Sequence, residues 1–333
     1  MKRIHSLVTG GAGFVGSHLC DFLIRQDHYV VCVDNLITGK MENIAHLRRH
    51  PRFRFVKQDI IKGLPRFLAL PRFLRDITRG FPRMLPKANY VFHLASPASP
   101  TGYMKNSIET ILTNSIGTYR LLEYCRKKGA KFLFASTSEV YGNPKVHPQV
   151  ETYWGNVNSF GPRACYDESK RLGEALVYEY FNKKGVNARL VRIFNTYGPR
   201  LNENDGRVVS NLITQALKGE ALTVYGDGSQ TRSFCYVEDL VRGLWLATSS
   251  PQTEGQVFNL GNPQETTILQ FTRLVKDLCG KPDAKIVKKP LPQDDPIKRK
   301  PDISKAKKIL KWEPKIPLKE GLKHTIEYYR GRI

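Results

Sequence analysis

Three features of this 333-residue sequence predict an α/β fold with a doubly wound parallel sheet and a smaller C-terminal domain. Short runs of β-branched and aromatic residues alternate with longer stretches of helical periodicity over the first two thirds of the chain. A glycine-rich turn follows the first of these runs. After about Asn195 the pattern becomes irregular, with Gly-Pro and Gly-Asp-Gly sequences between shorter helices.

The predicted elements alternate between strand and helix from the start of the chain. A strand, a helical crossover and a parallel strand form a right-handed unit, and repeated units place helices on both faces of one sheet. The irregular part divides the chain into two interleaved units, residues 1–194 with 234–262 and residues 195–233 with 263–333. Strands are expected at residues 4–8, 29–33, 54–56, 90–94, 131–135 and 188–193, and helices at 17–26 and 109–128.

The composition excludes a disordered chain and leaves a strong positive charge to explain. Lys and Arg number 53 against 30 Asp and Glu, which gives a formal net charge of +23, and 41% of the residues are hydrophobic. A chain this apolar buries enough surface to offset its conformational entropy. A basic balance suits a nucleic acid, an anionic membrane surface or a polyanionic substrate as partner.

The cysteines and the apolar runs favour a cytoplasmic protein. Six cysteines stand singly, without a C-x-x-C pair or a matching histidine cluster, which indicates reduced thiols and no metal site. No segment reaches the roughly 18 apolar residues that a membrane-spanning helix requires.

One segment, residues 61–88, interrupts the alternation of strands and helices. It contains a tandem Leu-Pro-Arg-Phe-Leu, four prolines, and seven basic residues against one Asp. This composition suits an amphipathic surface helix, so weak contact of residues 62–86 with an anionic membrane surface is one hypothesis. The alternatives are a solvated flap and local packing beside a substrate cleft.

The turn after the first strand has the spacing of a dinucleotide-binding site. Gly10, Gly13 and Gly16 allow a tight turn, a close approach of the backbone to a pyrophosphate, and packing of the helix on the strand. Asp34 ends the second strand, where its carboxylate would accept hydrogen bonds from a ribose and repel a 2′-phosphate. NAD is therefore favoured over NADP; alternatively, Asp34 is only a turn former.

Tyr166 and Lys170 lie one helical turn apart and form a candidate general base. An ammonium group beside a phenol favours the phenolate and lowers the pKa of the tyrosine, as a base for an alcohol requires. Thr137, at the end of an upstream strand, offers a hydroxyl that shares the substrate proton. The Y-x-x-x-K spacing alone also occurs by chance on exposed helices.

In this order and spacing, these signals resemble the extended short-chain dehydrogenase/reductase family from Ile4 to about Tyr329. Its members have a Rossmann domain and act on nucleotide sugars with bound NAD. Several longer sequence segments are similar to those of the branch that decarboxylates UDP-glucuronate to UDP-xylose. They include residues 93–100, 161–168, 192–200, 204–211 and 298–303.

The resemblance assigns NAD to residues 1–194 and 234–262, and the UDP-sugar to residues 195–233 and 263–333. The residues implied for NAD are Gly10, Gly13, Phe14, Val15, Gly16, Asp34, Asn35, Thr38, Gly39, Asp59, Ile60, Leu94, Ser96, Tyr166 and Lys170. Those implied for the sugar nucleotide are Ser96, Tyr103, Asn195, Arg207, Val209, Thr223, Val224, Tyr225, Gln230, Arg232 and Arg299.

The resemblance also implies a redox-neutral reaction. Oxidation at the sugar C4 gives a β-keto acid, which loses CO2, and the hydride then returns to C4. Thr137, Tyr166 and Lys170 would serve the oxidation. Arg299 would lie near the C6 carboxylate, and Glu139, through Ser138 or water, would help to protonate C5.

Several alternatives stay open at this point. Arg299 could be solvated in a Lys-rich tail, Glu139 could be a salt-bridge partner at a strand end, and Tyr225 could be a core residue. The reaction could be another epimerisation or dehydration, or a decarboxylation that releases the 4-keto pentose. A non-catalytic Rossmann protein that binds nucleic acid is the third class, but the intact catalytic set argues against it and no nucleic-acid partner is expected.

A homodimer is expected from the same resemblance, through the helix that carries the Y-x-x-x-K motif. The apolar spacing of Leu172, Leu176 and Tyr180 is compatible with such an interface.

Overall fold

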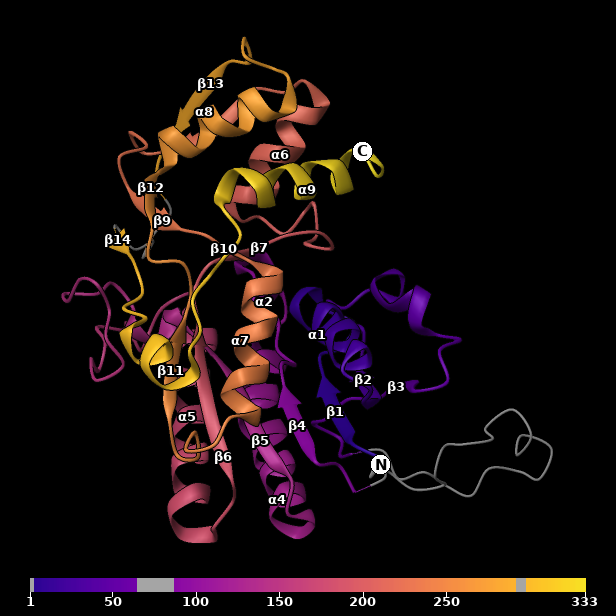
Figure 1. Cartoon of the computed structure of the whole chain (residues 1–333). Coiled ribbons are helices and arrows are strands. Elements are labelled where there is room, and N and C mark those ends of the chain that lie inside the picture. Colours follow the sequence, from indigo (N-terminus) through magenta and orange to yellow (C-terminus); the bar gives the residue numbers. More distant parts are fainter. Residues whose placement is uncertain (1–2, 65–86, 292–297) are drawn as a thin grey trace.

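The computed structural model describes residues 3–64, 87–291 and 298–333, and its centre is a seven-stranded parallel sheet (Figure 1). The strand order is β11-β6-β5-β4-β1-β2-β3. All neighbouring pairs in this sheet are parallel, so the predicted doubly wound fold is confirmed. The strands are β1 (His5–Thr9), β2 (Tyr29–Asp34), β3 (Phe53–Lys57), β4 (Tyr90–His93), β5 (Lys131–Thr137), β6 (Ala188–Ile193) and β11 (Val257–Leu260).

Six of these strands coincide with the predicted runs to within two residues at either end, and the main differences concern β11 and residues 109–128. The strand β11 was not predicted, because its Val-Phe-Asn-Leu run is short and lies in the irregular part of the chain. The expected helix at 109–128 is split into α3 (Ser107–Leu112), a π-helical turn η3 (Thr113–Gly117) and α4 (Thr118–Lys128).

Helices cover both faces of the sheet, as the alternation of side chains along its strands requires. Val8 points to one face, where it packs with Leu23 of α1 (Phe14–Arg25) and Leu240 of α7 (Val237–Ser249). Its neighbour Leu7 points to the other face, which α4 and α5 (Ala164–Lys184) cover. The strands are therefore buried on both sides, and the ends of the strands are left to bind ligands.

A second group of elements lies at one end of the sheet (Figure 1). Its core joins helices α6 (Val208–Lys218), α8 (Ile268–Cys279) and α9 (Leu318–Arg330). The small sheets are β12-β9-β14, β13-β8 and β10-β7. Their strands are β7 (Thr196–Tyr197), β8 (Leu222–Tyr225), β9 (Thr231–Ser233), β10 (Cys235–Tyr236), β12 (Glu265–Thr267), β13 (Ile286–Lys289) and β14 (Lys298–Arg299).

Four shorter elements complete the described chain: α2 (Pro100–Lys105), η1 (Met41–Leu47), η4 (Ser138–Tyr141) and η5 (Ala306–Leu310). Within the described ranges, no helix has the length and hydropathy needed to cross a membrane. The proposed membrane contact of residues 62–86 rests on a segment of which residues 65–86 lie outside the described residues.

Candidate active site

A cavity of about 1170 Å³ lies at the carboxyl ends of the central strands and is bounded on its other side by the second group of elements. The residues that follow or end strands β1, β2, β4, β5 and β6 all line it. Every residue that the sequence suggested for NAD, sugar or catalysis lines this cavity, except Val224. The Val224 side chain is buried in β8, because alternation along the strand turns Thr223 and Tyr225 toward the cavity instead. Tyr225 is therefore not a core residue.

The glycine turn leaves no room for side chains. Gly10 has a φ of +72°, and a Cβ atom there would lie 2.6 Å from the backbone nitrogen of Ala95. A Cβ atom on Gly16 would lie 2.1 Å from the carbonyl oxygen of Gly10. Helix α1 begins directly after Gly13 without a side-chain cap, so its first N–H groups are left for a ligand. This cradle fits a pyrophosphate.

Asp34 holds the next part of the cavity wall. Its carboxylate accepts hydrogen bonds from the backbone N–H groups of Leu36 at 2.8 Å and Ala12 at 3.0 Å. The bond to Leu36 is that of a turn former, and the same side chain lines the cavity, so its place in the turn is compatible with the expected contact to a ribose. Each carboxylate oxygen keeps a further lone pair, which fits the acceptor that a ribose diol needs.

Tyr166 and Lys170 lie on the buried side of α5, one turn apart. The Lys170 ammonium donates to the carbonyl oxygen of Ala135 at 2.7 Å and lies 5.8 Å from the centre of the Tyr166 ring. Burial lowers the pKa of Lys170 to about 7. Burial raises the pKa of Tyr166 above its ordinary value, and a hydrogen bond with Thr137 only partly opposes this. The expected lowering of the Tyr166 pKa by Lys170 is therefore not found in the protein by itself.

Glu139, on η4 directly after β5, sits between two guanidinium groups. One of its oxygens binds Arg299 of β14 and the other binds Arg163, which precedes α5. Burial alone would raise the pKa of Glu139, but the two cations outweigh burial and lower it to about 2. Glu139 is thus both an ion-pair partner and a residue of the cavity wall, and it is ionised at neutral pH.

Arg299 is buried in the folded chain, although its Lys-rich sequence context is typical of an exposed tail. Its side chain is only 3% exposed, so it is not a solvated part of the Lys-rich tail. The parallel register of β14 with β9 places Arg299 beside Arg232. Its Nε is buried and has no hydrogen-bond partner among the described residues. This guanidinium group, on a side chain that lines the cavity, therefore carries one donor without a partner in the described chain.

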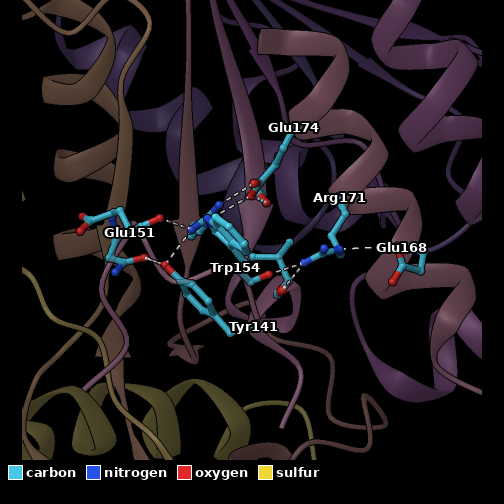
Figure 2. Close-up of polar contacts among 10 residues, drawn as sticks. Tyr141, Glu151, Trp154, Glu168, Arg171 and Glu174 are labelled. Atoms are coloured by element: carbon cyan, nitrogen blue, oxygen red, sulfur yellow. Dashed lines mark hydrogen bonds and ion pairs between the residues drawn. The ribbon is translucent and has the colours of Figure 1, made fainter. Parts of the chain in front are cut away.

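A polar network supports the segment that carries Glu139, as Figure 2 shows. Arg171 donates to the carbonyl oxygens of Val140 at 3.0 Å and Trp154 at 2.7 Å. Arg192 of β6 binds Glu174 of α5 at 2.7 Å and the hydroxyl of Tyr141 at 3.0 Å. None of these residues, nor Arg163, was predicted from the sequence to belong to the site. Arg163, Arg171 and Arg192 lie in or near the sequence segments 161–168 and 192–200, but only the folded chain brings them close to the segment that carries Glu139.

His93, at the end of β4, is a structural residue. His93 is buried between the hydroxyl groups of Thr9 at 3.0 Å and Thr118 at 3.1 Å, and burial lowers its pKa to about 3. It is neutral and is not a base. In the described part of the chain, no group of three His, Cys, Asp or Glu side chains is arranged to hold a metal ion.

Comparison with known proteins decides the family. Residues 6–261 match the model of the NAD dependent epimerase/dehydratase family. The chain belongs to this family. Its dependence on NAD agrees with the cofactor expected from the sequence, and the glycine cradle and Asp34 fit that cofactor.

Named relatives cover the chain from end to end. UDP-glucuronic acid decarboxylase 1 of Xenopus tropicalis is 51% identical over 332 residues, which are 100% of this chain and 73% of the relative. UDP-glucuronic acid decarboxylase 6 of Arabidopsis thaliana is 48% identical and is covered to 90%.

Solved structures of the family have the same fold. The UDP-glucose 4-epimerase of Thermotoga maritima with UDP-glucose has a TM-score of 0.84 at 36% identity, with 98% of this chain and 99% of that chain covered. The UDP-glucuronic acid 4-epimerase of Bacillus cereus, in complex with UDP-glucuronic acid and NAD, has a TM-score of 0.84 at 31% identity with the same coverage.

Proposed function

We propose that this protein is an NAD-dependent UDP-glucuronate decarboxylase that forms UDP-xylose and CO2 through a 4-keto sugar. The observation that carries the proposal is the buried Arg299 guanidinium, which lines the same cavity as Tyr166 and has one unpartnered donor among the described residues. A permanent cation at this place suits a substrate with a carboxylate. The full-length relatives named as decarboxylases support the same conclusion.

Tyr166, Thr137 and Lys170 serve the oxidation at the sugar C4. Bound NAD would supply the hydride acceptor for the oxidation at C4 and, in its reduced form, the hydride donor for the final reduction at the same carbon. The Tyr166 phenolate removes the proton of the C4 hydroxyl, and the Thr137 hydroxyl, which is hydrogen-bonded to Tyr166, shares it. In the proposed reaction the Lys170 ammonium favours the phenolate over the phenol, whereas in the protein by itself burial dominates and raises the pKa of Tyr166.

Arg299 and Glu139 serve the decarboxylation. The guanidinium group of Arg299 holds the C6 carboxylate so that the C5–C6 bond breaks, and its electrons pass into an enolate whose oxygen Tyr166 stabilises. CO2 leaves, and C5 takes one proton from solvent. Since Glu139 is ionised, it does not donate this proton itself but orients Ser138 or a water molecule that does. The overall reaction consumes one proton and one UDP-glucuronate.

We extend the proposal to the two interleaved units. Residues 1–194 and 234–262 would hold NAD, and residues 195–233 and 263–333 would hold the UDP-sugar. Arg232 and Arg207 would bind the diphosphate; both line the cavity, and Arg207 is oriented by Asp205 at 2.8 Å. A few of the cations that make up the net charge of +23 would thus bind the negatively charged substrate.

We also propose a homodimer, whose interface differs from the one expected from the sequence. Of the three apolar residues suggested by the sequence, Tyr180 is buried and its hydroxyl donates to Glu123 at 2.9 Å, and Leu176 is partly buried. Leu172 is 47% exposed, and α3 on the adjoining surface exposes Ile108 to 62%. These two residues would meet a second copy.

The test is incubation of the NAD-loaded protein with UDP-glucuronate, without added reductant, while CO2 and the nucleotide sugars are followed by NMR. UDP-xylose and CO2 in equal amounts are expected. Accumulation of a UDP-4-keto pentose would show that the intermediate is released, and UDP-galacturonate without CO2 would identify a 4-epimerase. Absence of any turnover would leave the protein as a nucleotide-binding one and refute the proposal.

A further inference from the structure

Arg163 was not among the residues expected to act in this cavity, yet it makes one of the two ion pairs of Glu139. It lines the cavity together with Glu139 and Arg299. Arg163 precedes α5 directly, while Arg299 comes from β14 in the second group of elements. Two cations from distant parts of the chain therefore share one carboxylate.

This arrangement has a surplus of charge. Arg163 and Arg299 each carry one positive charge and Glu139 carries one negative charge, so the three groups together carry +1. Besides this surplus of positive charge, the group has an unused hydrogen-bond donor. The Nε of Arg299 is buried and lacks a partner among the described residues. If Arg163 were neutral, Arg299 and Glu139 would compensate each other, and an added carboxylate would have to share the neighbouring Arg232 with the diphosphate.

We propose that Arg163 is a specificity-determining residue: it neutralises Glu139, so that Arg299 stays available for the carboxylate of the sugar. The inference rests on the proposed function, which it deepens by naming the group that selects an acidic sugar over a neutral one. Arg163 acts through Glu139, as a positioning residue, and keeps that carboxylate in place while Arg299 changes its partner.

Two further groups face Arg163. Asp167, one turn along α5, has Oδ2 at 4.0 Å from the Nε of Arg163, and its Oδ1 has no hydrogen-bond partner in the described chain. Burial raises the pKa of Asp167 to about 7, so this carboxyl is largely neutral in mildly acidic solution and leaves the surplus intact. Tyr103 is the second group, and burial raises the pKa of its phenol, so it is neutral as well.

The test compares the binding of two substrates by one variant. Dissociation constants for UDP-glucuronate and UDP-glucose are measured by titration calorimetry with NAD-loaded full-length protein that carries Tyr166→Phe, which prevents turnover. Adding Arg163→Gln should weaken the binding of UDP-glucuronate by about tenfold or more relative to that of UDP-glucose. Arg163→Lys should restore most of the preference for UDP-glucuronate. The control is Arg126→Gln, which removes an arginine from an exposed ion pair on α4 and should leave the ratio unchanged.

The ratio separates the proposal from simple damage. A variant that loses its fold locally would bind both nucleotide sugars more weakly and to the same extent. An unchanged ratio of the two dissociation constants would overturn the proposal. Failure of Arg163→Lys to restore the preference would also overturn it, because the proposed role requires only the charge. CO2 release by the unmodified protein is measured in parallel: if it is absent while the Arg163 variants behave as expected, the proposed reaction fails and the selection of an acidic sugar stands.

Discussion

The ring of Tyr103 stacks on the ring of Tyr166, with centroids 4.8 Å apart and planes inclined by 7°. Tyr103 comes from α2 and Tyr166 from α5, so the stack joins the segment after β4 to the helix that carries the proposed general base. The Tyr103 hydroxyl is buried and has no partner among the described residues. The ring therefore orients Tyr166, and the hydroxyl is free to contact the substrate.

Two variants should separate the effect of the Tyr103 hydroxyl from the effect of its ring. Tyr103→Phe keeps the ring and should mainly raise KM for UDP-glucuronate, by a few-fold, since one hydrogen bond is worth about 1 kcal/mol. Tyr103→Leu also removes the stack and should lower kcat by roughly tenfold more, because the Tyr166 ring is no longer held in place. Steady-state kinetics measure both effects. Equal kcat values in the two variants would show that the stack has no role.

The glycine turn gives a prediction with a matched control. Gly10→Ala should abolish NAD binding and destabilise the fold, because the methyl group meets the Ala95 backbone and the residue has a positive φ. Gly185, at the end of α5, has a similar φ of +62°, but a Cβ atom added there would meet nothing within 4 Å. Gly185→Ala should cost only about 1 kcal/mol and keep NAD binding. Fluorescence titration with NAD and thermal melts test the pair.

Removal of the Arg299 guanidinium should separate the two chemical steps. Arg299→Ala should lower CO2 release by about 10²–10³-fold, while the oxidation at C4, seen as nicotinamide absorbance in a single turnover, falls much less. Because Arg163 still binds Glu139, the loss in unfolding free energy should be only about 1–3 kcal/mol. Normal CO2 release by the variant would exclude the proposed role of Arg299.

The raised pKa of Asp167 predicts a pH dependence of stability. Burial, with help from Glu139, raises this pKa from 3.8 to about 7, against the opposing guanidinium groups of Arg163 and Arg299. The folded protein thus binds the proton more tightly than the unfolded chain does. The contribution of Asp167 to stability is therefore full below about pH 4 and falls as the pH rises to about 7.

Asp167→Asn should remove this fall. The variant should gain stability relative to the natural chain at about pH 8 and differ least at about pH 4, as thermal melts at several pH values would reveal. Glu168→Gln is the control, because Glu168 is the adjacent, more exposed carboxylate on α5, paired with Arg171. Among the groups around Asp167, Tyr103 and Tyr166 stay neutral over this range, since burial raises the pKa of each. A pH-independent difference would contradict the assignment.

The exposed apolar surface predicts the interface. Leu172→Glu should convert the proposed dimer to a monomer in sedimentation velocity runs, because it places a charge at the centre of an apolar contact. Tyr178→Glu changes a residue on another side of the same helix, which is 65% exposed, and should leave the dimer intact. If both variants dimerise like the natural chain, the α3–α5 surface is not the interface.

Local patterns were sufficient for much of this molecule. The strands β1 to β6 and the glycine turn follow from hydrophobic periodicity and from glycine positions close together in the sequence. The spacing of Tyr166 and Lys170 likewise follows from one turn of helix. The strand β11 was missed, since four residues without a period carry too little signal, and its pairing with β6 depends on residues far apart in the chain.

The sequence by itself determined the parallel sheet and the glycine cradle that fits NAD, and it predicted a candidate catalytic set, because these depend on backbone geometry and on near neighbours. Only the tertiary structure decided the charges. Arg299 and Glu139 are 160 positions apart, and their pairing, the share of Arg163 in it and the burial of Asp167 arise where η4, β14 and the start of α5 meet. Burial and nearby charges set a pKa, and neither is a property of a short segment. For that reason the spacing of Tyr166 and Lys170 predicted the base but not the direction in which burial shifts its pKa.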